Sequence, residues 1–341
     1  MGFNKGEWSE LYTFLSLLVE PSLAIVDENL QVINQNTFEI QEIYVANKSI
    51  YKIDENNILK ISHNSVKKTY KKEYLSTQKT LLLHKIQTHK KAKGSFDIIE
   101  INPLIDDLLD GNKLKGSSKK KGDLEALVLD NNRQNSIKLN YNIKSNLGAK
   151  ATLLNASSHT NFIYEISNID DEIMHKNNAI SGRKKLLDRC VFLEEHNASM
   201  KFVKVQSDTF SYNLKMIDSN LDRLLADMLY LSYQENEKDI KKLISMSIKD
   251  KDEYDFYQKK IGDFASAVTF GIMSSKKWNG KNEVNGGIIL VNKAGEVYLL
   301  DLIYFKSIVD KYLINNIKLE SPSSTRYKMF EIYKEDEKIL F

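Results

Sequence analysis

Cysteine and proline are scarce in this sequence: one cysteine, Cys190, and three prolines occur among 341 residues. A single cysteine excludes an internal disulfide and any zinc site built from several cysteines of one chain, which indicates a reducing compartment. No stretch approaches the ~18 consecutive apolar residues that a membrane-spanning helix needs. The first residues carry an acid early and lack the pattern of a secretory signal. The sequence therefore predicts a cytoplasmic protein with no membrane partner.

Positive charge is concentrated in one segment. Between Ile61 and Lys121 there are 14 lysines and 6 acidic residues, although the net charge of the whole chain is only +3. A concentrated basic patch attracts polyanions and speeds their encounter with the protein. The alternative is a set of solvated lysines, which are common in lysine-rich proteins.

Apolar residues recur at helical spacing at the start of the chain, in KGEWSELYTFLSLLVE. Trp8, Leu11, Leu15 and Leu18 would share one face, which predicts an amphipathic helix. The basic stretch 65–89 is expected to form one long helix. These patterns favour the α/β (α+β) class, with helices packed on a sheet.

Two hairpins are predicted from apolar runs that flank polar turns. One joins 124–129 to 137–145, and the other is NGGIILVNKAGEVYLLDLI, near the C-terminus. We expect a mixed central sheet flanked by helices within residues 1–170, with a basic insertion around 61–121. Residues 171–341 are expected to form a helix-rich part that contains the second hairpin and packs on this core.

The first hairpin brings together side chains that suit phosphodiester chemistry. A turn centred near Arg133 places Asp123 opposite about residue 143, within one register step of Lys144. Asn142 and Lys144 share a face because side chains alternate along a strand. A carboxylate can hold Mg²⁺ there, and a lysine can orient water and offset charge on the phosphate. The alternative is an ordinary hairpin with a solvated face.

The N-terminal helix offers further acids. Glu7 and Glu10 lie one turn apart, and Glu10 borders the apolar stripe, so that it could complete a metal site. The alternative for both is that acids in the first turns of a helix stabilise its positive dipole end.

Four stretches resemble, in the same order, the HpaII-type family of Type II restriction endonucleases. They are KGEWSELYTFLSLL, NIKSNLGAKATLLNASSHTNFIYEI, NGGIILVNKAGEV and KLESPSSTRY. The resemblance covers most of the chain, and residues from about Tyr51 to Lys120 are less similar. It implies a nuclease of the PD-(D/E)xK superfamily, in which an acid precedes one strand and acid-x-Lys lies on the next.

The resemblance assigns roles to individual residues. Asp123 takes the first acidic position and Lys144 the lysine position, whereas Asn142 stands where the superfamily usually has Asp or Glu. The resemblance implies a metal site of Asp123, Glu10 and Asn142, because Glu10 follows Gly6 at the spacing that related nucleases use on their first helix. Glu7 is the second choice for the missing acid. Glu125 is the third, because we expect it to alternate away from Asp123.

Short polar side chains after the lysine are candidates for contacts with DNA backbone or base edges. The predicted DNA-binding residues are Ser145, Asn155, Ser157, Ser158, His159, Thr160, Asn161, Arg326 and Lys328. The alternative for each serine, threonine or asparagine is turn and capping chemistry. For Arg326 and Lys328 the alternatives are a phosphate contact and a plain surface role.

The expected function is Mg²⁺-dependent hydrolysis of double-stranded DNA at a short palindrome such as CCGG, with Mn²⁺ able to substitute. The products would carry a 5′-phosphate and a 3′-hydroxyl. The implied partners are DNA, a second copy of the chain and, functionally, a cognate DNA methyltransferase. Two rival hypotheses stay open: a repair nuclease that recognises DNA structure or damage, and a DNA-binding protein that has lost catalysis through Asn142.

Overall fold

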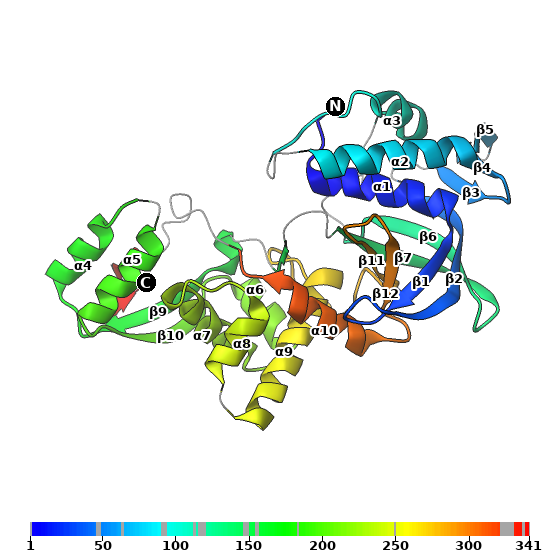
Figure 1. Ribbon diagram of the computed structural model, residues 1–341. Coiled ribbons are helices and arrows are strands. Elements are labelled where there is room, and N and C mark those ends of the chain that lie inside the picture. Colours follow the sequence, from blue (N-terminus) through cyan, green and yellow to red (C-terminus); the bar gives the residue numbers. More distant parts are fainter. Residues whose placement is uncertain are drawn as a thin grey trace. The chain divides into compact units, whose positions relative to one another are not determined.

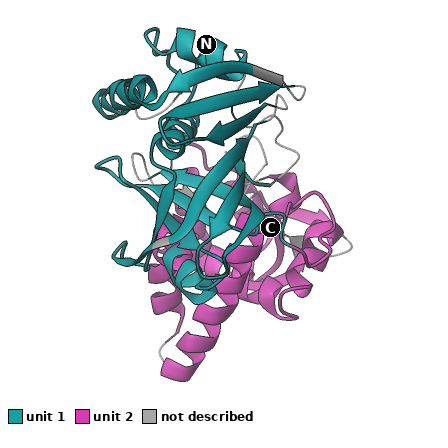
Figure 2. Ribbon diagram, turned by 90° about the vertical axis from the view of Figure 1, so that its right-hand side faces the viewer, with its two compact units in different colours: residues 1–150, 282–312 teal, residues 151–281, 313–341 magenta. Residues whose placement is uncertain are grey.

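The computed structural model of the chain consists of two compact units, coloured separately in Figure 2. It describes residues 2–45, 49–62, 65–89, 94–111, 114, 121–145, 150–153, 157–182, 184–248, 250–320, 331–335 and 338–340. Unit 1 comprises residues 1–150 and 282–312, and unit 2 comprises residues 151–281 and 313–341. The sequence predicts a single boundary near residue 170, whereas the structure divides the chain at 150 and returns the second hairpin to unit 1.

Unit 1 is built on a nine-stranded mixed sheet, as the α/β prediction requires (Figure 1). Its strands, in sheet order, are β1 (Ser22–Val26), β12 (Val297–Asp301), β11 (Gly287–Val291), β7 (Asn135–Ser145), β6 (Leu124–Asp130), β2 (Val32–Tyr44), β3 (Ile50–Ile53), β4 (Asn57–Ser62) and β5 (Ser65–Lys71). An additional pairing joins β1 to β2. The first six strands therefore close into a ring, and β3, β4 and β5 extend the sheet beyond β2.

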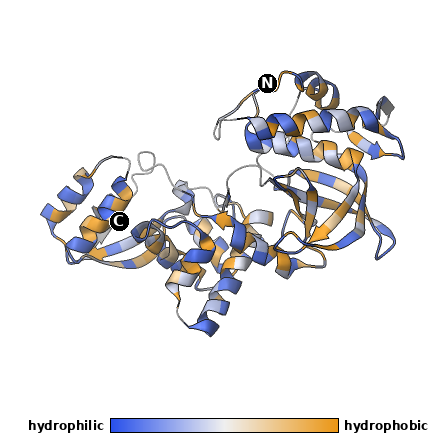
Figure 3. Ribbon diagram, viewed as in Figure 1, coloured by the Kyte–Doolittle hydropathy of each residue, from blue (hydrophilic) through white to orange (hydrophobic). Residues whose placement is uncertain are grey.

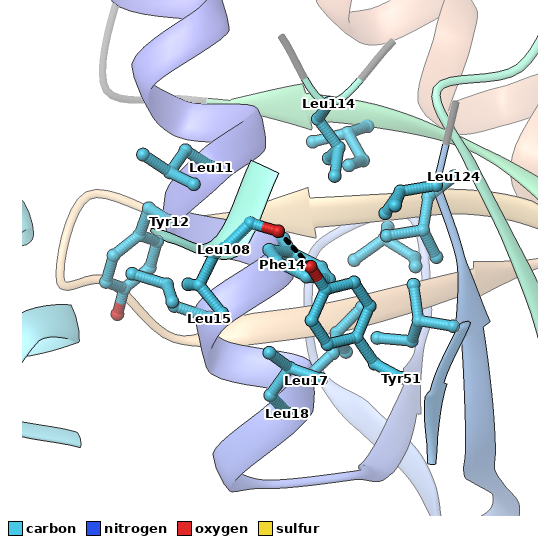
Figure 4. Packing of buried hydrophobic residues seen from close by; sticks show 14 of the residues in the cluster. Leu11, Tyr12, Phe14, Leu15, Leu17, Leu18, Tyr51, Leu108, Leu114 and Leu124 are labelled. Atoms are coloured by element: carbon cyan, nitrogen blue, oxygen red, sulfur yellow. Dashed lines mark hydrogen bonds between the residues drawn. The ribbon is translucent and has the colours of Figure 1, made fainter. Parts of the chain in front are cut away.

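Helix α1 (Lys5–Val19) is the central helix of unit 1. Asn4 caps it: the Asn4 side chain accepts the Glu7 N–H, and the Glu7 carboxylate accepts the Asn4 N–H. Residues 11–18 of α1 are all buried, and its apolar side chains join one cluster with residues of the strands (Figure 4). The Tyr51 hydroxyl in that cluster donates to the backbone oxygen of Leu108. The predicted N-terminal helix is thus confirmed, but its expected amphipathic character is wrong, because residues 11–18 are buried on every side of the helix.

The basic segment folds differently from the prediction. Residues 65–71 form β5, antiparallel to β4, and α2 (Lys72–Thr88) begins only afterwards. The expectation of one helix over 65–89 is therefore wrong for its first third. Helix α3 (Asn102–Leu109) follows, and α10 (Lys306–Asn316) begins after β12.

Unit 2 contains a four-stranded sheet in the order β10 (Ser199–Val205), β9 (Phe162–Ser167), β15 (Lys338–Leu340) and β14 (Tyr333–Glu335). Its other elements are β8 (Ala151–Thr152), the 3₁₀ helix η1 (Ser158–Thr160), α4 (Asp171–Ala179), α5 (Lys185–Glu195), α6 (Asp208–Lys215), α7 (Leu221–Gln234), α8 (Ile240–Ser247), α9 (Lys251–Phe270) and β13 (Ile317–Lys318). Cys190 is buried in the cluster between α5, α7 and this sheet. Burial raises the pKa of its thiol to about 12.

The hydropathy of the residues agrees with their burial in the core or exposure at the surface (Figure 3). Hydrophobic and hydrophilic residues are interspersed in the strands of the ring, and the first half of α9 is hydrophilic. All buried residues of α9 lie from Ile261 onward, so only its second half packs. None of the helices in the described residues is both long and apolar enough to cross a membrane.

Gly287 at the start of β11 offers a test of how tightly the ring is packed. Its φ is +117°, and a Cβ there would lie 2.2 Å from the Leu300 backbone oxygen. Gly94 also has a positive φ, +94°, but its Cβ would meet nothing within 4 Å. We expect Gly287→Ala to lower the free energy of unfolding by about 3 kcal/mol and Gly94→Ala by about 1 kcal/mol, because only the first adds a clash to the backbone strain. Urea unfolding followed by circular dichroism measures both, and equal losses would contradict the close packing at Gly287.

Candidate active site

The pairing of β6 with β7 determines which side chains meet. Seven residue pairs, from Asp130–Asn135 to Leu124–Tyr141, join the two strands antiparallel around the turn 131–134. One further step places Asp123 opposite Asn142. The sequence predicts residue 143 in that position, so the register differs by one residue, because the turn is centred half a residue before Arg133. Opposed residues share a face, which puts Asp123, Asn142 and Lys144 on the same side of the sheet.

Backbone contacts fix the Asp123 carboxylate beside this face. The Asp123 N–H donates to the Tyr141 oxygen at 2.8 Å. The Asp123 Oδ2 accepts the Ile143 N–H at 2.9 Å. Ile143 stands between Asn142 and Lys144 in the strand, so the carboxylate lies within one residue of both.

The surroundings of Asn142 and Lys144 are apolar. β11 runs parallel to β7 and places Ile288 beside Asn142 and Leu290 beside Lys144. Both of these neighbours are fully buried, and Asn142 itself is 6% exposed. The Lys144 side chain is half-buried and makes no hydrogen bond or ion pair with any described residue. An ammonium group beside apolar neighbours is available to a phosphate, and its charge acts strongly there because little water screens it.

Glu7 and Glu10 belong to a helix that packs on the other face of β7, away from Asn142 and Lys144. α1 packs against β7 and β11, and its apolar side chains share a cluster with Tyr141 and Ile143, which alternate away from Asn142. Glu10 is half-buried on this helix. The Glu7 carboxylate accepts the Asn4 N–H at 2.9 Å, which matches the structural alternative for an acid in the first turn of a helix.

Glu125 does not alternate away from Asp123, contrary to the prediction. Residues two apart in a strand share a face, so Glu125 lies on the same face as Asp123. Its carboxylate instead forms an ion pair with Lys138, which gives Glu125 a partner away from the metal position.

The donor set for a metal is small. The described residues include no group of three or more His, Cys, Asp or Glu side chains that could hold an ion. Asp123 and Asn142 nevertheless supply a carboxylate and an amide, and hard cations such as Mg²⁺ bind to oxygen donors of these kinds. The residues present therefore fit Mg²⁺ better than a metal that prefers sulfur or nitrogen.

The predicted DNA-binding residues lie in different units. Ser145 is half-buried at the end of β7 in unit 1, and the 157–161 group belongs to unit 2. Asn155, Arg326 and Lys328 lie outside the described residues.

Some residues of the 157–161 group already form the hydrogen bonds of a turn. Ser157 caps η1 and exchanges backbone and side-chain hydrogen bonds with Thr160. The Asn161 amide donates to Gln206. Ser158 and His159 are exposed, so these two are the members of the group best placed to contact DNA.

Several lysines of the basic segment have acidic partners. Lys68 pairs with Asp107, Lys79 with Glu20, and Lys85 with Glu100. The pairing neutralises part of the positive charge, which favours a structural role over polyanion binding for these three members of the segment.

Sequence reasoning missed Asn140, which lies two residues before Asn142 on the same face of β7. Its side chain bonds to the backbone of Lys121, two residues before Asp123, and to that of Glu283. The alternation along β7 places Asn140 on this face, but its contact with the segment before Asp123 was not predicted. The sequence gives no signal that residues near 283 come to it.

Comparison with known proteins identifies the family. A model of the HpaII restriction endonuclease family matches residues 4–341. The chain belongs to this family. It is 33% identical over 347 residues to Type II restriction enzyme HpaII of Haemophilus parainfluenzae, with 97% of this chain and 94% of that enzyme covered. No solved structure matches it. The chain is therefore a Type II, sequence-specific restriction endonuclease, as the resemblance of its motifs predicts.

Lys144 can be tested against a lysine of the same strand face. We expect Lys144→Met to lower the DNA cleavage rate by about 10²- to 10³-fold, because the variant loses a preorganised charge at the phosphate. Lys138→Met is the matched control, since Lys138 pairs with Glu125 and lies 4.0 Å from the centre of the Tyr44 ring. The control is expected to cleave at a rate within about twofold of the unaltered enzyme, because a surface ion pair contributes little. Similar losses in both variants would contradict a special role for Lys144.

Proposed function

We propose that this endonuclease hydrolyses double-stranded DNA with Mg²⁺ at a site built from Asp123, Asn142 and Lys144, in a PD-(D/E)xK core. The observation that carries the proposal is the Asp123 carboxylate, 2.9 Å from the backbone nitrogen between Asn142 and Lys144. The products would carry a 5′-phosphate and a 3′-hydroxyl, and Mn²⁺ would substitute for Mg²⁺.

Each residue has a distinct task. The Asp123 carboxylate and the Asn142 amide oxygen would hold the ion. When bound, Mg²⁺ polarises the phosphate and lowers the pKa of a coordinated water. Lys144 donates hydrogen bonds from its ammonium group to the attacking water or to a phosphate oxygen, and its charge offsets the negative charge that develops in the transition state. The buried neighbours Ile288 and Leu290 limit the water around these groups.

Glu10 is our choice for the second carboxylate, with Glu7 second. Glu10 lies on α1, which packs against Tyr141 and Ile143 on the face of β7 opposite to Asn142. It would therefore reach the ion around the end of the sheet where β6 begins, directly after Asp123. Glu7 is less suited because its carboxylate already caps α1.

The substrate is expected to be a short palindrome such as CCGG. Ser145 would contact DNA close to the cut, and Ser158 and His159 would contact it from unit 2, with Ser157, Thr160 and Asn161 shaping the turn that presents them. Asn155, Arg326 and Lys328 are further candidates for DNA contacts. Phosphate contacts by basic side chains would make binding salt-dependent.

The two strands of a palindrome are related by twofold symmetry, which suits a homodimer. A cognate methyltransferase would protect host DNA in the cytoplasm without being a subunit.

The first test is digestion of an unmethylated plasmid by purified enzyme with Mg²⁺, with Mn²⁺ and with EDTA. We expect discrete fragments with either metal and none with EDTA, because phosphodiester hydrolysis at this site depends on the ion. Asp123→Ala is expected to be inactive but to bind DNA. Fragments are sized on a gel and their ends sequenced.

Other outcomes of the digestion would replace the proposal. An intact plasmid whose DNA is still retarded on a gel would favour a binding protein inactivated by Asn142. An intact plasmid together with cleavage of branched or mismatched DNA would favour a structure-specific nuclease.

Asn142→Asp tests whether Asn142 is a ligand. The buried carboxylate should destabilise the metal-free protein, because moving a charge from water into apolar surroundings is costly. Mg²⁺ should restore the stability, since an ion bound only by the folded state stabilises it. We therefore expect Mg²⁺ to raise the melting temperature of Asn142→Asp more than that of the unaltered protein. An equal Mg²⁺ response in both proteins would contradict the assignment.

A further inference from the structure

The peptide segment that precedes Asp123 is held at both of its polar groups. The Lys121 N–H donates to the Glu283 Oε2 at 2.8 Å. The Lys121 oxygen accepts from the Asn140 Nδ2 at 3.3 Å. Between Lys121 and Asp123, Gly122 has a φ of +90°, and a Cβ there would lie 2.2 Å from the Asn140 Oδ1. The chain therefore enters the proposed active site through a turn that packs directly on the Asn140 amide.

Asn140 is in turn fixed by the segment 283–286. Its N–H donates to the Asn285 Oδ1 at 2.8 Å, and its oxygen accepts from the N–H groups of Asn285 and Gly286 at 3.2 and 3.0 Å. Its Nδ2 also donates to the Glu283 oxygen, at 3.1 Å. Asn140 is thus bonded through both backbone groups and through its side chain, so its amide has little freedom to turn.

The segment 283–286 lies where the chain returns from unit 2 to unit 1. It follows the last residue of unit 2 before the chain returns to unit 1, Lys281, and precedes β11, which begins at Gly287. Glu283, which accepts the Lys121 N–H, is therefore the second residue of unit 1 after the chain leaves unit 2.

We propose that Asn140 and Glu283 are positioning residues that set the Asp123 carboxylate for metal binding, with 283–286 as the support of the active site. The proposal rests on the proposed role of Asp123. Asn140 acts as a donor to two carbonyl oxygens, and Glu283 acts as an acceptor for the Lys121 N–H. Neither residue touches DNA or the ion in this assignment.

Substitutions at Glu283 and Asn140 distinguish a positioning role from direct binding of the metal. Glu283→Gln keeps an oxygen that can accept the Lys121 N–H but removes the charge, whereas Glu283→Ala removes both. Asn140→Asp replaces the donor by a carboxylate that would face the oxygens of Lys121 and Glu283, whereas Asn140→Ala only removes the donor. A positioning role therefore predicts that Glu283→Gln is close to the unaltered enzyme and that Asn140→Asp is worse than Asn140→Ala.

The experiment measures the cleavage rate of full-length variants as a function of Mg²⁺ concentration. We expect Asn140→Ala and Glu283→Ala to raise the Mg²⁺ concentration for half-maximal rate by about 10-fold or more, because residues that orient a metal ligand typically contribute about 10- to 100-fold. Glu283→Gln should stay within about threefold. Ser136→Ala is the matched control: it also loses a side-chain bond from β7, to Gln41, but far from Asp123.

Melting temperature and DNA binding with Ca²⁺ in place of Mg²⁺ separate misfolding from mispositioning. Glu283 is exposed, so its variants are expected to fold. A Glu283→Gln defect as large as that of Glu283→Ala would overturn the proposal in favour of a charged ligand. Responses of all variants equal to that of Ser136→Ala would overturn it as well. Failure of the unaltered enzyme to cut any DNA would instead refute the proposed function, and the variants play no part in that result.

Discussion

The hydrogen-bonded register between β6 and β7 is the constraint on which the proposed active site depends. In a strand, a shift of one residue moves every side chain to the other face. Here that shift would send Asp123 to the side of Tyr141 and Ile143, in the apolar cluster with α1. The actual register is held by the short turn at 131–134, whose amides at Asn132 and Arg133 are accepted by the buried Asp130 carboxylate. A carboxylate at the far end of the hairpin therefore helps to place Asp123, the carboxylate proposed to bind the metal.

The ring of strands explains why this register does not slip. β7 is bonded to β6 on one side and to β11 on the other, and the pairing of β1 with β2 closes the circuit. A displacement of β7 would disturb both neighbours and bury Lys144 among the apolar residues that face α1. Burying an unpaired ammonium is unfavourable, so the polar face of β7 and the closed ring favour the same arrangement.

Local sequence patterns accounted for the parts of the fold that depend on local interactions. The α1 stripe, the β6–β7 hairpin and the β11–β12 hairpin follow from spacing and turn residues within about 20 positions of one another. The strand at 65–71 was missed because its lysines have no apolar alternation, and its pairing with β4 decided its structure. The division into units was missed for a similar reason, since the parallel pairing of β11 with β7 joins residues more than 140 positions apart. In the candidate site, alternation placed Asn142 and Lys144 together, but no local pattern could bring Glu283 to Lys121.

The substitution at Asn142 changes the charge balance of the proposed metal site. An amide oxygen can coordinate Mg²⁺ but carries no formal charge, so it attracts the ion less than a carboxylate would. Lys144, which is close by, further opposes a cation. The negative charge that balances Mg²⁺ must then come from Asp123, from an acid of α1 and from the phosphates of bound DNA. In such a site the ion and the DNA favour each other's binding, because each supplies charge that the other lacks. An exact placement of Asp123 matters more under these conditions, since the backbone of β7 holds its carboxylate directly. This gives the bonds at Lys121 and Asn140 their importance.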